Sequence, residues 1–247
     1  MKKIRISAVS YTNTKPFLYG IQHTDIINKI DLSLDIPADC AQKLIDDRVD
    51  IGLIPVAAIL NLPHWEIVSD YCIGAVGAVN SVFIFSNCDI HDITKLQLDP
   101  QSRSSNNLAR VLLKNFWKVD PELITNAKDY SIADDATTAF VQIGDRTFGK
   151  KDKYPFVYDL AEKWQKFTGL PFVFAAWIAN KSISQDFIEE FNKALKIGLD
   201  HRAELLKELP AVADFDLEDY LMYKLDFDLT DSKKKALHLF LDYVKAL

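Results

Sequence analysis

The sequence contains few of the residues that build disulfides or metal sites. Its three cysteines are widely spaced and form no Cys-x-x-Cys pair: Cys40, Cys72 and Cys88. An odd number without a disulfide or zinc spacing predicts buried thiols in a reducing compartment. The five histidines are scattered and form no cluster with carboxylates: His23, His64, His91, His201 and His238. We therefore expect neither a metal site nor a catalytic thiol.

Other absences exclude common ligands and locations. The sequence has no Gly-x-Gly-x-x-Gly, P-loop or Gly-x-Ser-x-Gly motif, so dinucleotide, triphosphate and serine-hydrolase functions lack support. The net charge of −6 argues against nucleic acid or a membrane surface as a partner. The longest apolar runs, 51–60 and 170–179, are about ten residues and too short to span a bilayer. We see no secretory signal before the first strand and expect a cytoplasmic protein, while the oligomeric state is not predicted.

What the sequence does contain is an alternation of strand and helix patterns, which is typical of an α/β fold. Strands at 4–9, 32–36 and 50–54, each followed by a helical segment, predict a parallel sheet covered on both faces. A second set follows, in this order: strand 97–98, helix 106–117, a strand near 130, helix 134–141, helix 158–168 and strand 172–179. The tail from residue 184 is mostly helical, with one apolar stripe: Phe187, Phe191, Leu195 and Leu199.

The strands at 81–86 and 172–179 bracket the middle of the chain. This arrangement predicts two α/β lobes joined by a pair of crossing strands, with a cleft between them. We place lobe 1 at residues 1–85 and 177–247 and lobe 2 at residues 86–176. Small ligands usually bind in such clefts, so a small-molecule partner is expected.

The segment 98–110, LDPQSRSSNNLAR, is the most informative in the chain. A strand pattern ends at 99–100, and a hydroxyl-rich turn then opens an amphipathic helix. Three serines and one arginine lie where the first helical N–H groups lack partners: Ser102, Arg103, Ser104 and Ser105. Amides, hydroxyls and a guanidinium at the positive end of a helix dipole suit a carboxylate or phosphate. An ordinary serine N-cap, which stabilises a helix by about 1 kcal/mol, would give the same pattern.

Three other segments end strands with residues that suit a ligand. In the segment 10–16, the candidates Ser10, Asn13 and Thr14 follow the first strand, although a simple Asx or Ser/Thr turn explains them equally well. Val56 opens a helix after a buried strand and would offer a backbone amide. Ser81 is the polar residue at the start of an apolar crossing strand, where a strand-end residue facing water is the favoured interpretation.

The fourth strand end is the segment 141–146, VQIGDR. Gly144 would let the backbone approach a ligand closely, and Asp145 would project from the strand end. A common Gly-Asp turn is the simpler interpretation.

Together these segments resemble the chorismate dehydratases of the futalosine route to menaquinone. The matching segments cover residues 6 to about 180 in family order: VSYTNTKP, DIGLIP, NSVFIFS, LDPQSRSS, IGDR and YDLAEKWQKFTGLPFVFAAW. The last is the most specific, whereas the tail beyond residue 180 matches only in helical character. The sister 1,4-dihydroxy-6-naphthoate synthases share the fold but fit LDPQSRSS and YDLAEKW less well.

The resemblance implies a type II periplasmic-binding-protein fold used as a cytoplasmic enzyme. It implies dehydration of chorismate to 3-[(1-carboxyvinyl)oxy]benzoate, a hydro-lyase reaction, without a metal or organic cofactor. The family pocket would include Asn13 and Ser81, with Ser104 and Ser105 receiving a carboxylate. The residue before Ser81 is Asn80, where we expect Arg in many relatives. Arg103 is our candidate to supply a charge that Asn80 lacks.

The chemistry fits these residues. Loss of the proton at ring carbon 3 leaves charge that spreads onto the ring carboxylate, where helix-start donors would stabilise it as an oxyanion hole does. Asn13 and Ser81 would hold the substrate and assist loss of the hydroxyl at ring carbon 4. Either Asp145 or a carboxylate of the substrate would take the proton.

Two other functions fit the same segments. A sister synthase would act on a naphthoquinone-pathway precursor rather than chorismate. A solute-binding protein for a small carboxylate would use the same cleft without catalysis. Solute-binding proteins normally act outside the cytoplasm and carry a signal or lipid anchor, which favours the enzyme here.

Overall fold

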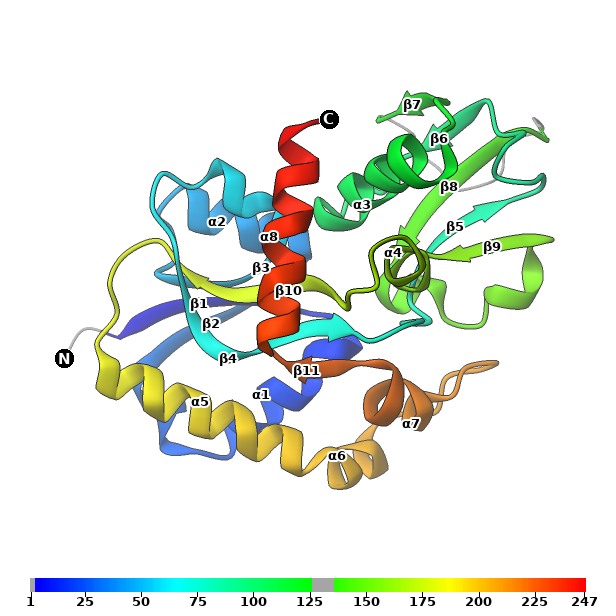
Figure 1. The fold of residues 1–247 in the computed structure, drawn as a ribbon. Coiled ribbons are helices and arrows are strands. Elements are labelled where there is room, and N and C mark those ends of the chain that lie inside the picture. The colour runs from blue at the N-terminus through cyan, green and yellow to red at the C-terminus, as the bar shows by residue number, and fades with distance from the viewer. Residues whose placement is uncertain (1–2, 126–135) are drawn as a thin grey trace.

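Two β-sheets form the framework of the protein, each in its own lobe (Figure 1). The structure is a computed structural model that describes residues 3–125 and 136–247. The predicted strand near residue 130 lies outside the described residues. The sequence predicted two α/β lobes, and each sheet with its helices forms one of them.

The sheet of the first lobe combines strands from both ends of the chain. In the described residues its order is β11-β4-β10-β3-β1-β2. The strands are β1 (Ile4–Val9), β2 (Ile30–Asp35), β3 (Ile51–Pro55), β4 (Glu66–Ala75), β10 (Phe172–Ala179) and β11 (Asp226–Asp228). β1 pairs in parallel with β2 and β3, as predicted, whereas β10 runs antiparallel between β3 and β4.

The sheet of the second lobe is drawn from the middle of the chain, in the order β7-β6-β8-β5-β9. The strands are β5 (Val82–Ser86), β6 (Lys95–Gln97), β7 (Glu122–Ile124), β8 (Thr138–Ile143) and β9 (Phe156–Asp159). The prediction of a helix over 134–141 is wrong for its described part, because Thr138–Val141 belong to β8. There every residue is buried between β5 and β6, and a fully buried strand has no polar face that would distinguish it from a helix.

Helices cover both sheets. They are α1 (Lys15–Gln22), α2 (Pro37–Ile45), α3 (Ser104–Leu112), α4 (Leu160–Thr168), α5 (Gln185–Asp200), α6 (Arg202–Glu208), α7 (Leu217–Asp219) and α8 (Asp231–Lys245). Short 3-10 or π turns complete the described elements: η1 (Thr12–Thr14), η2 (Asp25–Lys29), η3 (Val56–Asn61), η4 (Leu113–Trp117), η5 (Gly144–Thr147), η6 (Lys151–Lys153) and η7 (Tyr220–Lys224). The four residues of the predicted stripe on α5 are all buried.

The chain passes between the lobes twice, between β4 and β5 and between α4 and β10 (Figure 1). The boundaries drawn from the sequence, 85/86 and 176/177, fall inside β5 and β10, a few residues after these crossings. Asp159 links the two segments that cross between the lobes through hydrogen bonds of its side chain. Its carboxylate caps α4 and also accepts hydrogen bonds from the backbone N–H groups of Val79 and Asn80, at 3.0 and 2.7 Å. Burial raises the pKa of Asp159 to about 6, against the effect of these bonds.

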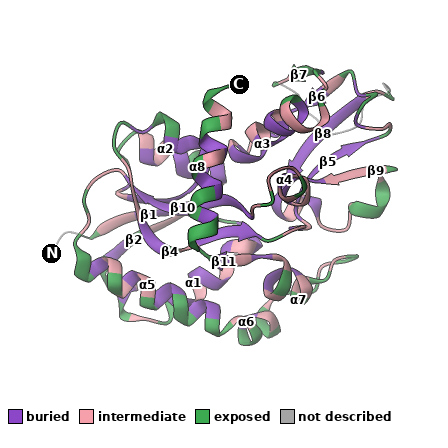
Figure 2. Cartoon of the chain, in the orientation of Figure 1, coloured by how far each residue is buried: buried purple, intermediate pink, exposed green. Residues whose placement is uncertain are grey.

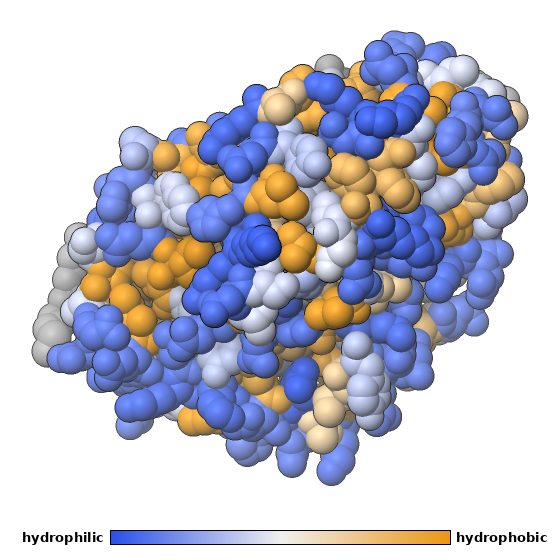
Figure 3. Space-filling model, in the orientation of Figure 1, coloured by the Kyte–Doolittle hydropathy of each residue, from blue (hydrophilic) through white to orange (hydrophobic). Residues whose placement is uncertain are grey.

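The buried residues follow the two sheets, and exposed residues lie mainly on the outer helices and loops (Figure 2). On the face drawn in Figure 3, hydrophobic residues form separate patches among hydrophilic ones. α8 lies across this face and packs against β10, α3 and η3, so the C-terminal helix touches both lobes. Among residues 3–125 and 136–247, we find no helix that combines the length and apolarity needed to cross a membrane.

Candidate functional site

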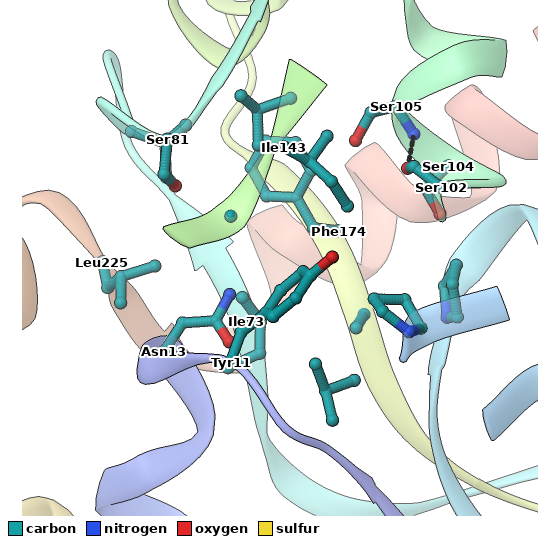
Figure 4. Close-up of a pocket in the computed structure, with 17 residues that line it drawn as sticks. Tyr11, Asn13, Ile73, Ser81, Ser102, Ser104, Ser105, Ile143, Phe174 and Leu225 are labelled. Carbon is teal, nitrogen blue, oxygen red and sulfur yellow. Dashed lines mark hydrogen bonds between the residues drawn. The ribbon is translucent and has the colours of Figure 1, made fainter. Parts of the chain in front are cut away.

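A pocket lies between the lobes, where strands and helix starts from both sheets converge (Figure 4). It holds about 520 Å³ of empty space, including its open mouth. The described residues that line it are all uncharged: Val9, Tyr11, Asn13, Pro37, Pro55, Ile73, Val79, Ser81, Val82, Ser102, Ser104, Ser105, Ile143, Gly144, Phe174, Ala175 and Leu225. Six of the predicted site residues are therefore brought together here. Apolar walls with a few hydroxyls and amides suit a small, partly apolar ligand.

Asn13 and Ser81 lie on one side of this pocket (Figure 4). Asn13 belongs to η1, directly after β1, so its position follows from the end of a parallel strand. Ser81 stands where the chain enters β5, and its backbone oxygen accepts a hydrogen bond of 2.8 Å from the N–H of Gly144. Its side chain is buried rather than facing water.

Tyr220 lies behind Ser81 on this side, and no local sequence pattern predicted it. Its hydroxyl donates to Ser81 Oγ at 2.9 Å. Burial of the whole side chain raises the pKa of Tyr220, so the phenol keeps its proton. No spacing in the sequence connects position 220 with position 81, because 139 residues separate them.

The three serines at the start of α3 face the pocket from the opposite side (Figure 4). Ser102 Oγ accepts a hydrogen bond of 3.0 Å from the N–H of Ser105, which caps the first turn. Ser104 Oγ accepts one of 3.1 Å from the N–H of Ala57 in the other lobe. All three serines are buried. The capping interpretation therefore holds for Ser102, and the same turn also presents the helix start to the pocket.

Tyr11 forms the floor between these two sides. Its ring lies against Gly144, where an added Cβ would come within 2.5 Å of ring carbons, so only glycine leaves room for it. Gly144 also has a φ of +65°, which favours glycine. The Tyr11 hydroxyl donates to Gln101 Oε1. Burial raises the pKa of Tyr11, and the charge of Arg146 opposes this shift.

Arg146 is held behind Tyr11 by a buried partner. Its guanidinium donates to Asp99 Oδ2 at 2.6 Å, and the Asp99 side chain is fully buried. Arg146 also follows Asp145 in the VQIGDR segment, and no pattern around it predicted this role. The pair places a neutralised positive charge near the pocket without exposing it there.

Two of the predicted site residues join the lobes instead of lining the pocket. Asp145 accepts hydrogen bonds from the N–H of Thr12 at 3.0 and 3.1 Å and from Thr12 Oγ1 at 2.8 Å. Arg103 donates to Gln42 Oε1 at 2.9 Å. These bonds, with the one between Ser104 and Ala57, connect the first lobe to the second around the mouth. The protein is therefore in a closed conformation.

The remaining predicted residues do not line the pocket. Thr14 is buried and donates to Asn13 Oδ1 at 3.2 Å, which orients the amide. Val56 is fully buried next to the lining residue Pro55. Ser10 is exposed, and its N–H donates to the backbone oxygen of Asp35 at 2.9 Å.

Asn80 does not face this pocket. It lines a neighbouring cavity and accepts a hydrogen bond of 3.5 Å from Lys151 Nζ. Its backbone has a φ of +58°, in the left-handed region that asparagine tolerates better than most residues. Within the described part of the chain, no three His, Cys, Asp or Glu side chains are grouped so as to hold a metal ion.

Comparison with known proteins decides the family. Residues 4–246 match the family described as Menaquinone biosynthesis. The chain belongs to this family. Among curated relatives, the chorismate dehydratase of Campylobacter jejuni is 26% identical over 249 residues, which cover 97% of this chain and 96% of that protein.

Solved structures related to this member of the menaquinone biosynthesis family share its fold at low identity. A protein from Archaeoglobus fulgidus has a TM-score of 0.78 at 15% identity, covering 99% of this chain and 97% of its own. The alkanesulfonate-binding protein from Xanthomonas axonopodis pv. citri, solved with MOPS, has a TM-score of 0.63 at 14% identity, covering 100% and 93%. A Candida albicans protein described as having the generic periplasmic binding protein fold has a TM-score of 0.63 at 12% identity, covering 100% and 91%.

Proposed function

We propose that this protein is a chorismate dehydratase acting in the cytoplasm in the futalosine route to menaquinone. The reaction is a hydro-lyase elimination of water that gives 3-[(1-carboxyvinyl)oxy]benzoate. It involves no net oxidation, and formation of the aromatic ring supplies the driving force. The family and the named relative support the substrate.

The observation that carries the proposal is the distribution of donors around the pocket. One side presents Asn13 and Ser81, and the opposite side presents the serines at the start of α3. The pocket can therefore hold the ring carboxylate at one end and the ring hydroxyl at the other. The apolar walls between them, including Phe174 and Ile143, suit the carbon ring.

The first bond change would be loss of the proton from ring carbon 3. The electron pair left behind is conjugated with the ring carboxylate, so negative charge grows on the oxygens at the start of α3. Each well-placed donor to such a charge contributes about 3–4 kcal/mol to lowering the barrier. The bond between ring carbon 4 and its hydroxyl then breaks, with Asn13 and Ser81 as hydrogen-bonding partners of the leaving oxygen.

The closed conformation favours a carboxylate of the substrate as the base. Asp145 is not among the lining residues, and Thr12 donates to both of its carboxylate oxygens. The enolpyruvyl carboxylate of chorismate is attached through an ether to ring carbon 3 itself. It can therefore reach the proton without a protein base, and Asp145 serves to close the site.

The test is turnover of chorismate by the purified protein after treatment with a chelator. We expect the ultraviolet spectrum to change to that of a benzoate, with a product 18 mass units lighter, about the mass of one water. Ser81→Ala should lose most of this activity and keep its folded circular dichroism spectrum. Chorismate that decays only at its spontaneous rate would refute the proposal, and a thermal-shift screen of small carboxylates would then test the solute-binding function.

A further inference from the structure

Tyr220 is the part of the site that the chemistry above leaves without a role. It lies in η7, in the tail of the chain, and is 1% exposed. Its ring is held edge-on against the stacked pair Phe148 and Phe215, with ring centroids 5.4 and 5.3 Å away. A buried phenol needs a hydrogen-bond partner, and this one is directed at the pocket residue Ser81.

The hydrogen bond between Tyr220 and Ser81 has a defined direction. The phenol has one hydrogen, and it goes to Ser81 Oγ at 2.9 Å. Ser81 is therefore the acceptor of this hydrogen bond. The neighbouring Asn13 amide is held separately, because Thr14 donates to its oxygen at 3.2 Å.

The direction of this hydrogen bond determines where the Ser81 hydroxyl can donate its own hydrogen. A hydroxyl that accepts from Tyr220 directs its own hydrogen elsewhere, and Ser81 lines the pocket. Accepting one hydrogen bond also polarises a hydroxyl and makes it a stronger donor. Ser81 thus presents a polarised O–H group to the ligand.

We infer that Tyr220 is a positioning residue for the dehydration, acting through Ser81 to aim a hydrogen-bond donor at the departing hydroxyl group. The inference rests on the proposed function and adds a residue to it. The bond between ring carbon 4 and oxygen breaks, and the hydroxide leaves within the hydrogen bond from Ser81. The proton that completes the water is the one removed from ring carbon 3, so Ser81 and Tyr220 both keep theirs.

The test is Tyr220→Phe, which keeps the ring packed edge-on against Phe148 and Phe215 and removes only the hydroxyl. We expect kcat to fall about tenfold and KM to stay within about twofold, because the lost interaction acts on bond breaking rather than binding. Tyr158→Phe is the matched control. That hydroxyl is likewise hydrogen-bonded, accepting from the N–H of Ile90 at 2.8 Å and donating to Asp89 Oδ2 at 3.4 Å, but away from the pocket. We expect its kcat to be unchanged.

A double variant separates positioning from a structural role. If Tyr220 acts through Ser81, then Ser81→Ala combined with Tyr220→Phe should be no slower than Ser81→Ala alone. The inference would be overturned if the loss of kcat in the double variant were the product of the two single losses. It would also be overturned if the kcat of Tyr220→Phe equalled that of wild type. Either result would leave the proposed dehydratase function standing. No turnover by the wild-type protein would overturn both. Should Tyr220→Phe not fold, 3-fluorotyrosine placed at position 220 keeps the hydroxyl and changes its acidity; an unchanged kcat would then overturn the inference.

Discussion

Removing the carboxylate of Asp145 tests whether this residue closes the site or takes the proton. In Asp145→Ala, the Thr12 N–H and hydroxyl lose their partner across the lobes. A closing role predicts weaker substrate binding and a modest loss of kcat. A role as the base predicts a loss of kcat of about 10²- to 10⁴-fold with little change in KM.

The size of the closing effect can be estimated from the geometry. A hydrogen bond to a charged group contributes about 1.5–3 kcal/mol, and two donors are involved. Asp145 is half-buried, and water replaces both donors when the lobes open, so only part of this energy favours the closed form. We take about 1.4 kcal/mol as the net free energy by which these hydrogen bonds favour the closed form. That energy corresponds to about a tenfold shift from closed to open protein. We therefore expect KM to rise by up to about tenfold.

Steady-state kinetics with chorismate measures this directly, with small-angle scattering to report opening. Asp92→Ala is the matched control, since it removes the same charge from an exposed position in the same lobe. We expect the control to keep wild-type kinetics and the Asp145 variant to scatter as a more open particle. A loss of kcat beyond about 100-fold at unchanged KM would refute the closing role and restore Asp145 as the base.

Three further predictions concern other parts of the molecule. Gly144→Ala should raise KM by about tenfold or more, because the new Cβ would come within 2.5 Å of the Tyr11 ring; binding measured by calorimetry that matches wild type would contradict this contact. Burial raises the pKa of Asp50, but hydrogen bonds from Arg5 outweigh burial and leave this pKa below its ordinary value. The contribution of Asp50 to stability is therefore present above about pH 4 and is lost as the pH falls further. In urea denaturation, Asp50→Asn should have a lower free energy of unfolding than wild type at pH 7. Between pH 7 and pH 3, the variant should lose less of this free energy than wild type does. An equal loss in the two proteins would count against the pairing of Asp50 with Arg5. Lys233→Met should lower the free energy of unfolding by about 2–4 kcal/mol, because the buried ammonium donates to Asp226 and to the backbone oxygen of Asp228; an unchanged urea midpoint would disprove this.

Local patterns in the sequence predicted most elements of the fold. Alternation placed β1, a continuous apolar run placed β10, and helical spacing placed the buried face of α5. The pattern failed at residues 138–141, where a strand buried on both faces has no alternation to show. It also missed β11, because three residues at the edge of a sheet carry too short a signal.

The candidate site was predictable only where the signal is local. The serine-rich start of α3 and the strand end at Asn13 were found because their residues are consecutive in the sequence. Tyr220 could not be found this way, since its role comes from a contact with a residue 139 positions away. Arg103 and Asp145 carry the charges that suggested a site, yet their closest partners are Gln42 and Thr12 of the other lobe. Sequence alone does not distinguish a charge that binds a ligand from one that joins two lobes.

The position of β10 has a consequence for how the chain folds during synthesis. β10 lies between β3 and β4, so the first sheet stays divided until residues 172–179 have been made. Until then β3 and β4 each expose an unpaired edge, which is a template for association with other chains. The strands of the second sheet, by contrast, lie between residues 82 and 159 and can pair as soon as that segment emerges. The lobe that contains β1–β4 is therefore completed after the second sheet, and its early strands keep edges open to association until β10 has been made.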